Sequence, residues 1–308
     1  MTAAIETAGL TKTYGAARGI TDVDLTVEPG EVFGFLGPNG AGKTTMIRVL
    51  LDLVRPTAGS ARVLGLDAHA DAIAVHRRIG YVAGDPALDD RLTGRALCAW
   101  LGRLRGTPDP VGVDALAERL VVDLDRPIRV LSKGNRQKVA LVQAFVHRPD
   151  LLLLDEPTSG LDPIVQETFA EMVREVADAG RTVFLSSHRL DEVQQVCDRV
   201  GIIADGRVIA VDRVDDLRAR AFRTVEIEFG APVDPAPFAA LAGVDGVEVD
   251  GPVLRLRAVG DLDALVKLAA SHHVVDLVSE PPELEEIFLG YFDGDGADDT
   301  EGSGSGAG

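Results

Sequence analysis

Short apolar runs alternate with longer amphipathic segments over about the first 220 residues of the chain. Residues 32–36, 151–154 and 182–185 are apolar runs of the length that a buried strand needs. Between such runs lie segments with apolar residues at helical spacing, such as the stripe of Val165, Phe169, Met172, Val173 and Val176. This alternation predicts a mainly parallel sheet covered by helices on both faces.

Two regions depart from that alternation. Residues 5–14 and 22–27 alternate apolar and polar side chains, which is typical of half-exposed antiparallel strands. Residues 85 to about 127 read mostly as helix, with 96–104 the clearest piece. We therefore expect one domain over residues 1–220, with an antiparallel β subdomain at its start and a helical subdomain at about 85–150.

A separate, smaller pattern follows in residues 221–292, which we expect to form an α+β accessory domain. The predicted elements are strands at 225–229, 253–256 and 274–278, a helix at 261–270 and a last helix from about Pro282. Residues 293–308 are mainly Gly, Ser, Asp and Ala, and they carry too little apolar surface to order themselves. They are predicted to be a disordered acidic tail.

A glycine-rich loop joins the strand at 32–36 to the helix that follows. It fits the phosphate-binding pattern G-x-x-x-x-G-K-[ST], and its residues are Gly37, Pro38, Asn39, Gly40, Ala41, Gly42, Lys43, Thr44 and Thr45. Glycines let backbone N–H groups point at phosphate oxygens, and the helix N-terminus adds partial positive charge. Lys43 can reach the β- and γ-phosphates, and Thr44 can ligate Mg²⁺. A plain turn does not require the complete Gly-Lys-Thr-Thr ending, so the loop predicts a nucleoside triphosphate site.

Two further polar groups follow apolar strands. Asp155 and Glu156 end the run at 151–154, which places them at the carboxyl edge of the sheet beside the phosphate loop. There Asp155 can hold Mg²⁺, and Glu156 can orient or deprotonate the attacking water. His188 follows the run at 182–185 and is expected at the same edge, within reach of a γ-phosphate or that water. The alternative for each is an ordinary polar residue in a turn.

Composition narrows the class of protein. The chain has 308 residues, 46% of them hydrophobic, which suffices for folded cores. It has no run of about eighteen apolar residues and no secretory signal at its start. Cys98 and Cys197 are isolated, as expected in a reduced compartment. The net charge of −18 argues against binding nucleic acid, and it predicts that any membrane contact runs through a protein partner.

These motifs occur in the order found in the nucleotide-binding subunits of ATP-binding-cassette (ABC) transporters, and residues 5–215 resemble that family. Residues 131–137 resemble its signature loop, and residues 155–162 match its Walker B motif and D-loop almost without change. The resemblance identifies His188 with the family's switch histidine and Tyr14 with the aromatic residue that stacks on adenine. It implies the α/β fold of a P-loop NTPase that binds ATP and Mg²⁺ and hydrolyses the ATP.

The resemblance also implies a site shared between two subunits, either identical or paralogous. ATP on one phosphate loop would be covered by the signature loop of the other subunit, so Ser132, Gly134 and Asn135 join the nucleotide-binding residues. Asp162 of the D-loop joins them as well. On its own, Ser132 reads as a helix N-cap and Gly134 as a turn, and these readings are compatible with the first because a capped helix N-terminus is an anion site.

Two segments depart from the family pattern. Lys133 and Asn135 stand where the signature loop usually has Gly and Gln, variants that resemble those of prokaryotic exporters. Gly84 stands where the family places a Gln that touches Mg²⁺ and senses the membrane partner. We hypothesise that Asp85 or a water molecule replaces this metal contact, and that Gly84 makes the loop more mobile.

The implied function is an ATPase subunit that powers a separate transmembrane permease from the cytoplasmic face of the membrane. The accessory unit, ending in Glu-Leu-Glu-Glu-Ile-Phe at 283–288, looks like that of ABC-2 type exporters, which move drugs, antibiotics, lipids or polysaccharides outward. An importer ATPase is the main alternative. A ribosome-acting ATPase is disfavoured by the single cassette and the acidic charge, and an ATPase of DNA ends would need a long coiled coil between Lys43 and Asp155.

Overall fold

The computed structural model describes residues 2–15, 17–106, 112–220 and 222–280. The chain divides into two units, Met1–Asp212 and Arg213–Gly308. The expected boundary at residue 220 coincides with the end of helix α8 (Val214–Arg220), which belongs to the second unit. Within the described ranges, no helix combines the length and apolar character needed to cross a bilayer.

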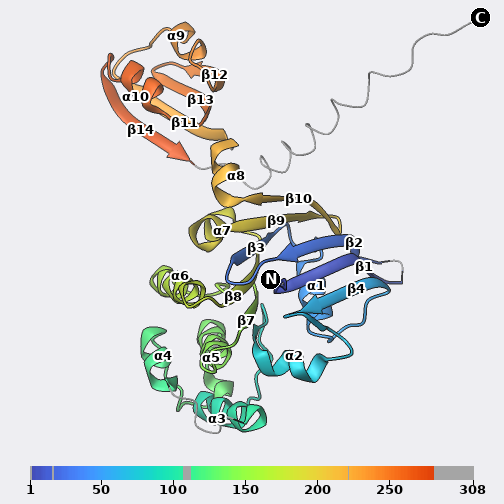
Figure 1. Ribbon diagram of the computed structural model, residues 1–308. Coiled ribbons are helices and arrows are strands. Elements are labelled where there is room, and N and C mark those ends of the chain that lie inside the picture. The colour runs from blue at the N-terminus through green and yellow to red at the C-terminus, as the bar shows by residue number, and fades with distance from the viewer. Residues whose placement is uncertain (1, 16, 107–111, 221, 281–308) are drawn as a thin grey trace, which may run out of the picture. The chain divides into compact units, whose positions relative to one another are not determined.

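A six-stranded sheet forms the centre of the first unit (Figure 1). Its strands are β3 (Val32–Leu36), β6 (Ile79–Val82), β7 (Leu151–Asp155), β8 (Thr182–Ser187), β9 (Arg199–Ala204) and β10 (Arg207–Arg213). They lie in the order β10-β9-β3-β8-β7-β6, and the neighbours from β9 to β6 are parallel. The predicted α/β class is therefore confirmed. Asp205 and Gly206 form the turn that joins β9 to β10, with positive φ at both residues.

Helix α1 (Lys43–Leu50) packs between this sheet and a second, antiparallel one. The buried core around it joins Met46 and Ile47 of the helix to Phe33 and Phe35 of β3. The intervening residue Gly34 faces the other side of the sheet, where an added Cβ would lie 2.8 Å from Val193 of helix α7 (Leu190–Val196). β3 is thus buried on both faces, which explains why its sequence shows an apolar run instead of alternation.

The antiparallel sheet has the order β2-β1-β4-β5. Its strands are β1 (Ile5–Tyr14), β2 (Ala17–Val27), β4 (Ala58–Val63) and β5 (Leu66–Asp67). β2 begins at Ala17, before the start predicted at residue 22. Asp22 has a φ of 54°, and the pairing of β2 with β1 shifts register several times. These irregularities interrupt the period-two pattern and conceal the first half of the strand.

Three of the remaining helices of the first unit begin with a side-chain cap. Thr93, Ser132 and Asp162 each accept a hydrogen bond from a backbone N–H in the first turn of α3, α5 and α6, respectively. These helices span Gly94–Arg105 (α3), Lys133–Phe145 (α5) and Pro163–Asp178 (α6), together with α2 (Ala72–Arg78), α4 (Val113–Arg119) and a 3₁₀ turn at Ile128–Val130. Figure 1 shows α6 and α7 on one side of the central sheet and α1 on the other.

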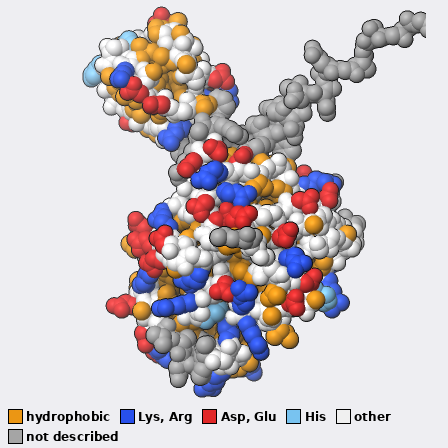
Figure 2. Space-filling view, viewed as in Figure 1, with side chains coloured by type: hydrophobic (Ala, Val, Ile, Leu, Met, Phe, Trp, Pro, Cys, Tyr) orange, Lys and Arg blue, Asp and Glu red, His pale blue; other side chains and the backbone are white. Residues whose placement is uncertain are grey.

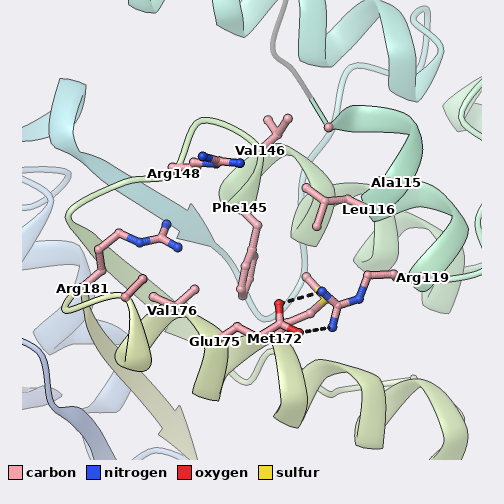
Figure 3. Close-up of a pocket in the computed structure, with 12 residues that line it drawn as sticks. Ala115, Leu116, Arg119, Phe145, Val146, Arg148, Met172, Glu175, Val176 and Arg181 are labelled. Carbon is pink, nitrogen blue, oxygen red and sulfur yellow. Dashed lines mark hydrogen bonds and ion pairs between the residues drawn. The ribbon is translucent and has the colours of Figure 1, made fainter.

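Helices α4, α5 and α6 border a groove lined by Phe145 and Met172 (Figure 3). Across it Arg119 donates to both carboxylate oxygens of Glu175, at 2.7 and 2.8 Å. No residue of the phosphate loop is among the described residues that line this groove. The groove is therefore separate from the candidate active site.

The second unit contains a four-stranded antiparallel sheet in the order β12-β13-β11-β14. Its elements are β11 (Phe222–Phe229), α9 (Ala236–Ala239), β12 (Val244–Asp250), β13 (Val253–Val259), α10 (Asp263–Ala269) and β14 (Val274–Glu280). β12 and α9 escaped prediction, because β12 is largely exposed and acidic and α9 is a single turn. The predicted last helix from Pro282 and the predicted tail at 293–308 lie outside the described residues.

We expect Gly80→Ala to destabilise the first unit. An added Cβ at this position of β6 would lie 2.3 Å from the carbonyl oxygen of Ala144 in α5 and 2.7 Å from Cδ2 of Leu152. Overpacking of this kind costs about 2 kcal/mol, which should lower the calorimetric midpoint by about 4–8 °C.

Gly180→Ala is the matched control for Gly80→Ala. Gly180 has a φ of 74° but no heavy atom within 4 Å of an added Cβ. The free energy of unfolding of this variant should fall only by the cost of an alanine in the left-handed conformation, about 1 kcal/mol. Equal losses in the two variants would contradict the packing role of Gly80.

Candidate active site

The phosphate loop lies between β3 and α1 and depends on its glycines. Gly40 and Gly42 have φ values of 84° and 114°, where other residues are strained. An added Cβ at Gly42 would lie 2.7 Å from the carbonyl oxygen of Gly19, and one at Gly37 would lie 2.3 Å from that of Ile203. The loop is therefore closely held by its neighbours, and side chains at these positions would displace it.

Lys43 is buried and its ammonium group has three oxygen partners. Its Nζ donates to the carbonyl oxygens of Gly37 at 2.6 Å and Pro38 at 3.1 Å. It also lies 3.3 Å from Oε1 of Glu156, with which it forms an ion pair. The charge that the sequence assigns to phosphate binding is thus held inside the loop, adjacent to the carboxylate that the sequence assigns to water activation.

Asp155 ends β7 and is buried beside the loop. Its Oδ2 accepts a hydrogen bond from the Thr44 hydroxyl at 2.8 Å, and its Oδ1 accepts one from the Ser186 hydroxyl at 2.6 Å. A carboxylate and a hydroxyl are hard oxygen donors of the kind that Mg²⁺ prefers. The described residues contain no cluster of three or more His, Cys, Asp or Glu that could hold a metal alone. The donor set therefore fits a Mg²⁺ ion that takes its other ligands from phosphates and water.

Glu156 contacts His188 as well as Lys43. His188 Nδ1 lies 2.6 Å from Glu156 Oε2, although the two residues are far apart in the sequence. Glu156 has a φ of 47°, which is uncommon for a residue with a side chain. Its backbone N–H donates to the carbonyl oxygen and the hydroxyl of Ser186, at 3.1 and 3.2 Å. These contacts direct a carboxylate, oriented by an imidazole, toward the phosphate loop, as a general base requires.

A cavity of about 400 Å³ brings together several of the predicted site residues. The predicted residues that it brings together are Asn39, Thr44, Asp85, Asp155, Glu156 and His188. Tyr81 also lines this cavity. Burial raises the pKa of the Tyr81 hydroxyl, and the negative charge of Asp155 raises it further. A cavity with three carboxylates favours a cation near the phosphates.

Gly84 lies at the wall of the same cavity. An added Cβ there would lie 3.3 Å from the carbonyl oxygen of Asp155 and 3.4 Å from Cβ of Glu156. The absence of a side chain therefore leaves space next to the two carboxylates. Asp85, the neighbouring residue, lines this space.

Other predicted residues lie outside this cavity. Tyr14 is 42% exposed at the end of β1, with the Lys12 ammonium 5.2 Å from its ring centroid. Ser132 caps α5 by accepting from the Asn135 N–H at 3.3 Å, and Gly134 is packed against Gly160. Asp162 caps α6 by accepting from Val165 N–H. The remaining loop residues, Pro38, Ala41 and Thr45, shape the turn and the start of α1.

Sequence reasoning missed several residues of the site, Tyr81 and Ala83 of the cavity wall among them. Ser186 hydrogen-bonds Asp155, and Ser159 and Arg48 line the cavity. Ser186 precedes His188 at the end of an apolar strand, which was a usable signal for a polar residue at the active edge. Arg48 carried no signal, because an exposed arginine in an amphipathic helix is ordinary.

Comparisons with known proteins identify the family. A family model for ABC transporters matches residues 20–159. Over 94% of its length the chain is 36% identical to the daunorubicin/doxorubicin resistance ATP-binding protein DrrA of Streptomyces peucetius, of which it covers 92%. The chain belongs to the ABC transporter family of ATP-binding proteins. It is an ABC-type ATPase, which converts ATP and water to ADP and phosphate.

Two further matches support the cassette. The chain is 35% identical to the bacitracin transport ATP-binding protein BcrA of Bacillus licheniformis, over 74% of this chain and 76% of that protein. A solved ATP-binding subunit of an ABC transporter superposes with a TM-score of 0.64 at 30% identity, covering 70% of this chain and 92% of the other. The predicted family and fold are confirmed.

We expect Glu156→Gln to abolish turnover while leaving nucleotide binding intact. The amide cannot accept a proton from water, and general-base catalysis contributes about 100-fold or more. Lys43 and the loop backbone, which are predicted to hold the phosphates, are not substituted in this variant. Phosphate release and the binding of a fluorescent ATP analogue measure the two effects, with the surface variant Glu171→Gln as control. Turnover near that of the unmodified cassette would refute the role of Glu156.

Proposed function

We propose that the cassette powers export through a separate transmembrane permease, from the cytoplasmic face of the membrane. The observation that carries the proposal is the contact of Glu156 with both Lys43 and His188, beside the Thr44–Asp155 pair. Export as the direction is supported by relatives named for drug resistance and bacitracin transport. The proposed cargo class is a drug, an antibiotic, a lipid or a polysaccharide.

The proposed chemistry assigns roles to Lys43 and to five residues that line the cavity. Thr44 and Asp155 would hold Mg²⁺, which when bound neutralises charge on the phosphates. Lys43 exchanges the carbonyl oxygens of its own loop for phosphate oxygens, which are stronger partners for an ammonium. Glu156 accepts a proton from the attacking water, and His188 keeps the carboxylate oriented. Asp85 is proposed to make a further metal contact, direct or through water, in the place left by Gly84.

Completion of the site is proposed to require a second cassette, identical or paralogous. Ser132, Gly134 and Asn135 line no part of the cavity just described. They lie at the N-terminus of α5, a helix of 13 residues with no acidic residue in its first turn. That terminus carries uncompensated positive charge and suits the γ-phosphate bound by another chain. Tyr14 is proposed to stack on adenine, and Asp162 to lie at the dimer contact.

Attachment to the membrane is proposed to run through the permease alone. Trp100 and Leu104 lie one turn apart on α3 and are 52% and 63% exposed. They form an apolar surface on the helical region that a protein partner can cover. On the face in view, Figure 2 shows acidic and basic side chains intermingled over the first unit. With a net charge of −18, such a surface favours neither nucleic acid nor anionic lipid as the partner.

Mixing two inactive variants tests the shared site. Lys43→Ala removes the phosphate-loop half, and Ser132→Arg blocks the signature half. In a mixed dimer one site keeps both intact halves, so about a quarter of normal turnover should return when dimers form at random. Mixing Lys43→Ala with Thr44→Ala, which damage the same half, should restore nothing. No recovery in the first mixture would contradict the shared site.

Affinity purification tests the transporter role. A tagged Glu156→Gln chain, isolated with ATP from detergent-solubilised membranes of its source, should retain a membrane-spanning protein. Trp100→Glu should weaken that recovery, because a charge in an apolar contact is costly. Ile73→Glu, on the exposed face of α2, is the matched control. Recovery of ribosomes or nucleic acid without a membrane protein would overturn the proposal.

A further inference from the structure

Glu192 is a buried carboxylate for which the active site has so far assigned no role. It lies in the first turn of α7, four residues after His188 in the chain, and is 7% exposed. Its Oε1 is buried and has no hydrogen-bond partner among the described residues. A carboxylate costs free energy in such a place, so packing alone gives no reason for its presence.

The first contact of Glu192 is with Ser187. The Ser187 hydroxyl donates to Oε2 of Glu192 at 2.5 Å, and the same hydroxyl oxygen accepts a hydrogen bond from the Arg189 N–H at 3.0 Å. Ser187 and Arg189 are the two neighbours of His188. Through one hydroxyl, Glu192 therefore restrains the backbone on both sides of the histidine.

The second contact is with the loop that follows Glu156. Thr158 and Glu192 line the same cavity. Burial raises the pKa of the Glu192 carboxylate, and hydrogen bonding to Ser187 and then Thr158 lowers it. Thr158 is itself buried. Its loop is closed by hydrogen bonds from Ser159 N–H to Glu156 O, at 3.1 Å, and from Leu161 N–H to Thr158 O, at 3.0 Å. Glu192 thus bridges the Glu156 loop and the His188 loop.

Such a bridge matters because Glu156 is held in an unfavourable backbone conformation. A left-handed φ of 47° persists at a glutamate only when its surroundings enforce it. Ser186 fixes the backbone N–H of Glu156 from one side. Thr158, held by Glu192, fixes the chain on the other side.

We propose that Glu192 is a positioning residue, which joins Ser187 to Thr158 and so keeps His188 within hydrogen-bond distance of Glu156. The inference rests on the catalytic roles proposed above for Glu156 and His188. This positioning role requires a side chain with a hydrogen-bond acceptor, long enough to reach the hydroxyls of Ser187 and Thr158 at once. An amide oxygen meets that requirement and an alkyl side chain does not.

The experiment compares three substitutions in the full chain. Glu192→Leu, of similar size but without an acceptor, should lower kcat about 10- to 100-fold, as small misplacements of catalytic groups do. The apparent dissociation constant for ATP should change less than about twofold, since no phosphate contact is touched. Glu192→Gln should keep kcat within about threefold. Asp191→Asn, an exposed neighbour paired with Arg189, is the matched control and should behave as the unmodified chain.

A double variant separates positioning from general damage to the fold. If Glu192 acts through His188, Glu192→Leu should add little to the loss caused by His188→Ala, because coupled residues are not additive. Multiplying losses would overturn the inference. So would a Glu192→Gln variant as inactive as Glu192→Leu, or a loss explained by weaker ATP binding. Circular dichroism melting curves check that each variant is folded. If Glu192→Leu does not fold, Ser187→Ala takes its place and should cause the same loss of kcat.

The same set of variants distinguishes this inference from the proposed active site. Normal turnover in Glu156→Gln or His188→Ala would contradict the active site and the inference together. A large loss in both of those variants, with none in Glu192→Leu, would contradict the inference alone.

Discussion

Strands β3, β7 and β8 run parallel in a register that brings their carboxyl ends to one edge of the sheet. Leu36 lies beside Ser187, and Asp155 lies beside Ser186. The phosphate loop and His188 follow the last residues of β3 and β8, and the acidic pair spans the end of β7, so all three lie at that edge. A slip of one residue would turn Asp155 to the opposite face, away from Thr44. The chemistry of the cassette depends on this register more than on any single hydrogen bond.

Charge balance at that edge explains how Lys43 and Asp155 remain buried. Lys43 is neutralised by Glu156 and solvated by two carbonyl oxygens of its own loop. Asp155 accepts hydrogen bonds from two hydroxyl groups, and neither of these partners carries a negative charge. Partners of this kind reduce the cost of burial while leaving each group free to exchange them for phosphate, metal or water. A rigid apolar edge would be more stable and could not make that exchange.

Local patterns predicted the elements and the residues whose chemistry is written in a short segment. The phosphate loop is such a segment, since its glycines, Lys43 and Thr44 serve one turn of backbone. The parallel class followed from apolar runs that are buried on both faces. Strand order did not follow, because it depends on how crossover helices pack. β12 and α7 escaped notice, since an acidic edge strand and a seven-residue helix carry little periodic signal.

The sequence by itself determined that this chain binds phosphates, that it folds as an α/β cassette and that Glu156 and His188 each follow a buried strand. Only the tertiary structure decided that Lys43 and His188 share the Glu156 carboxylate, that Ser186 holds Asp155 and that Glu192 reaches Ser187 and Thr158. These contacts join residues that belong to different strands and loops. They arise from register and packing, which depend on the whole core at once and which no local pattern encodes.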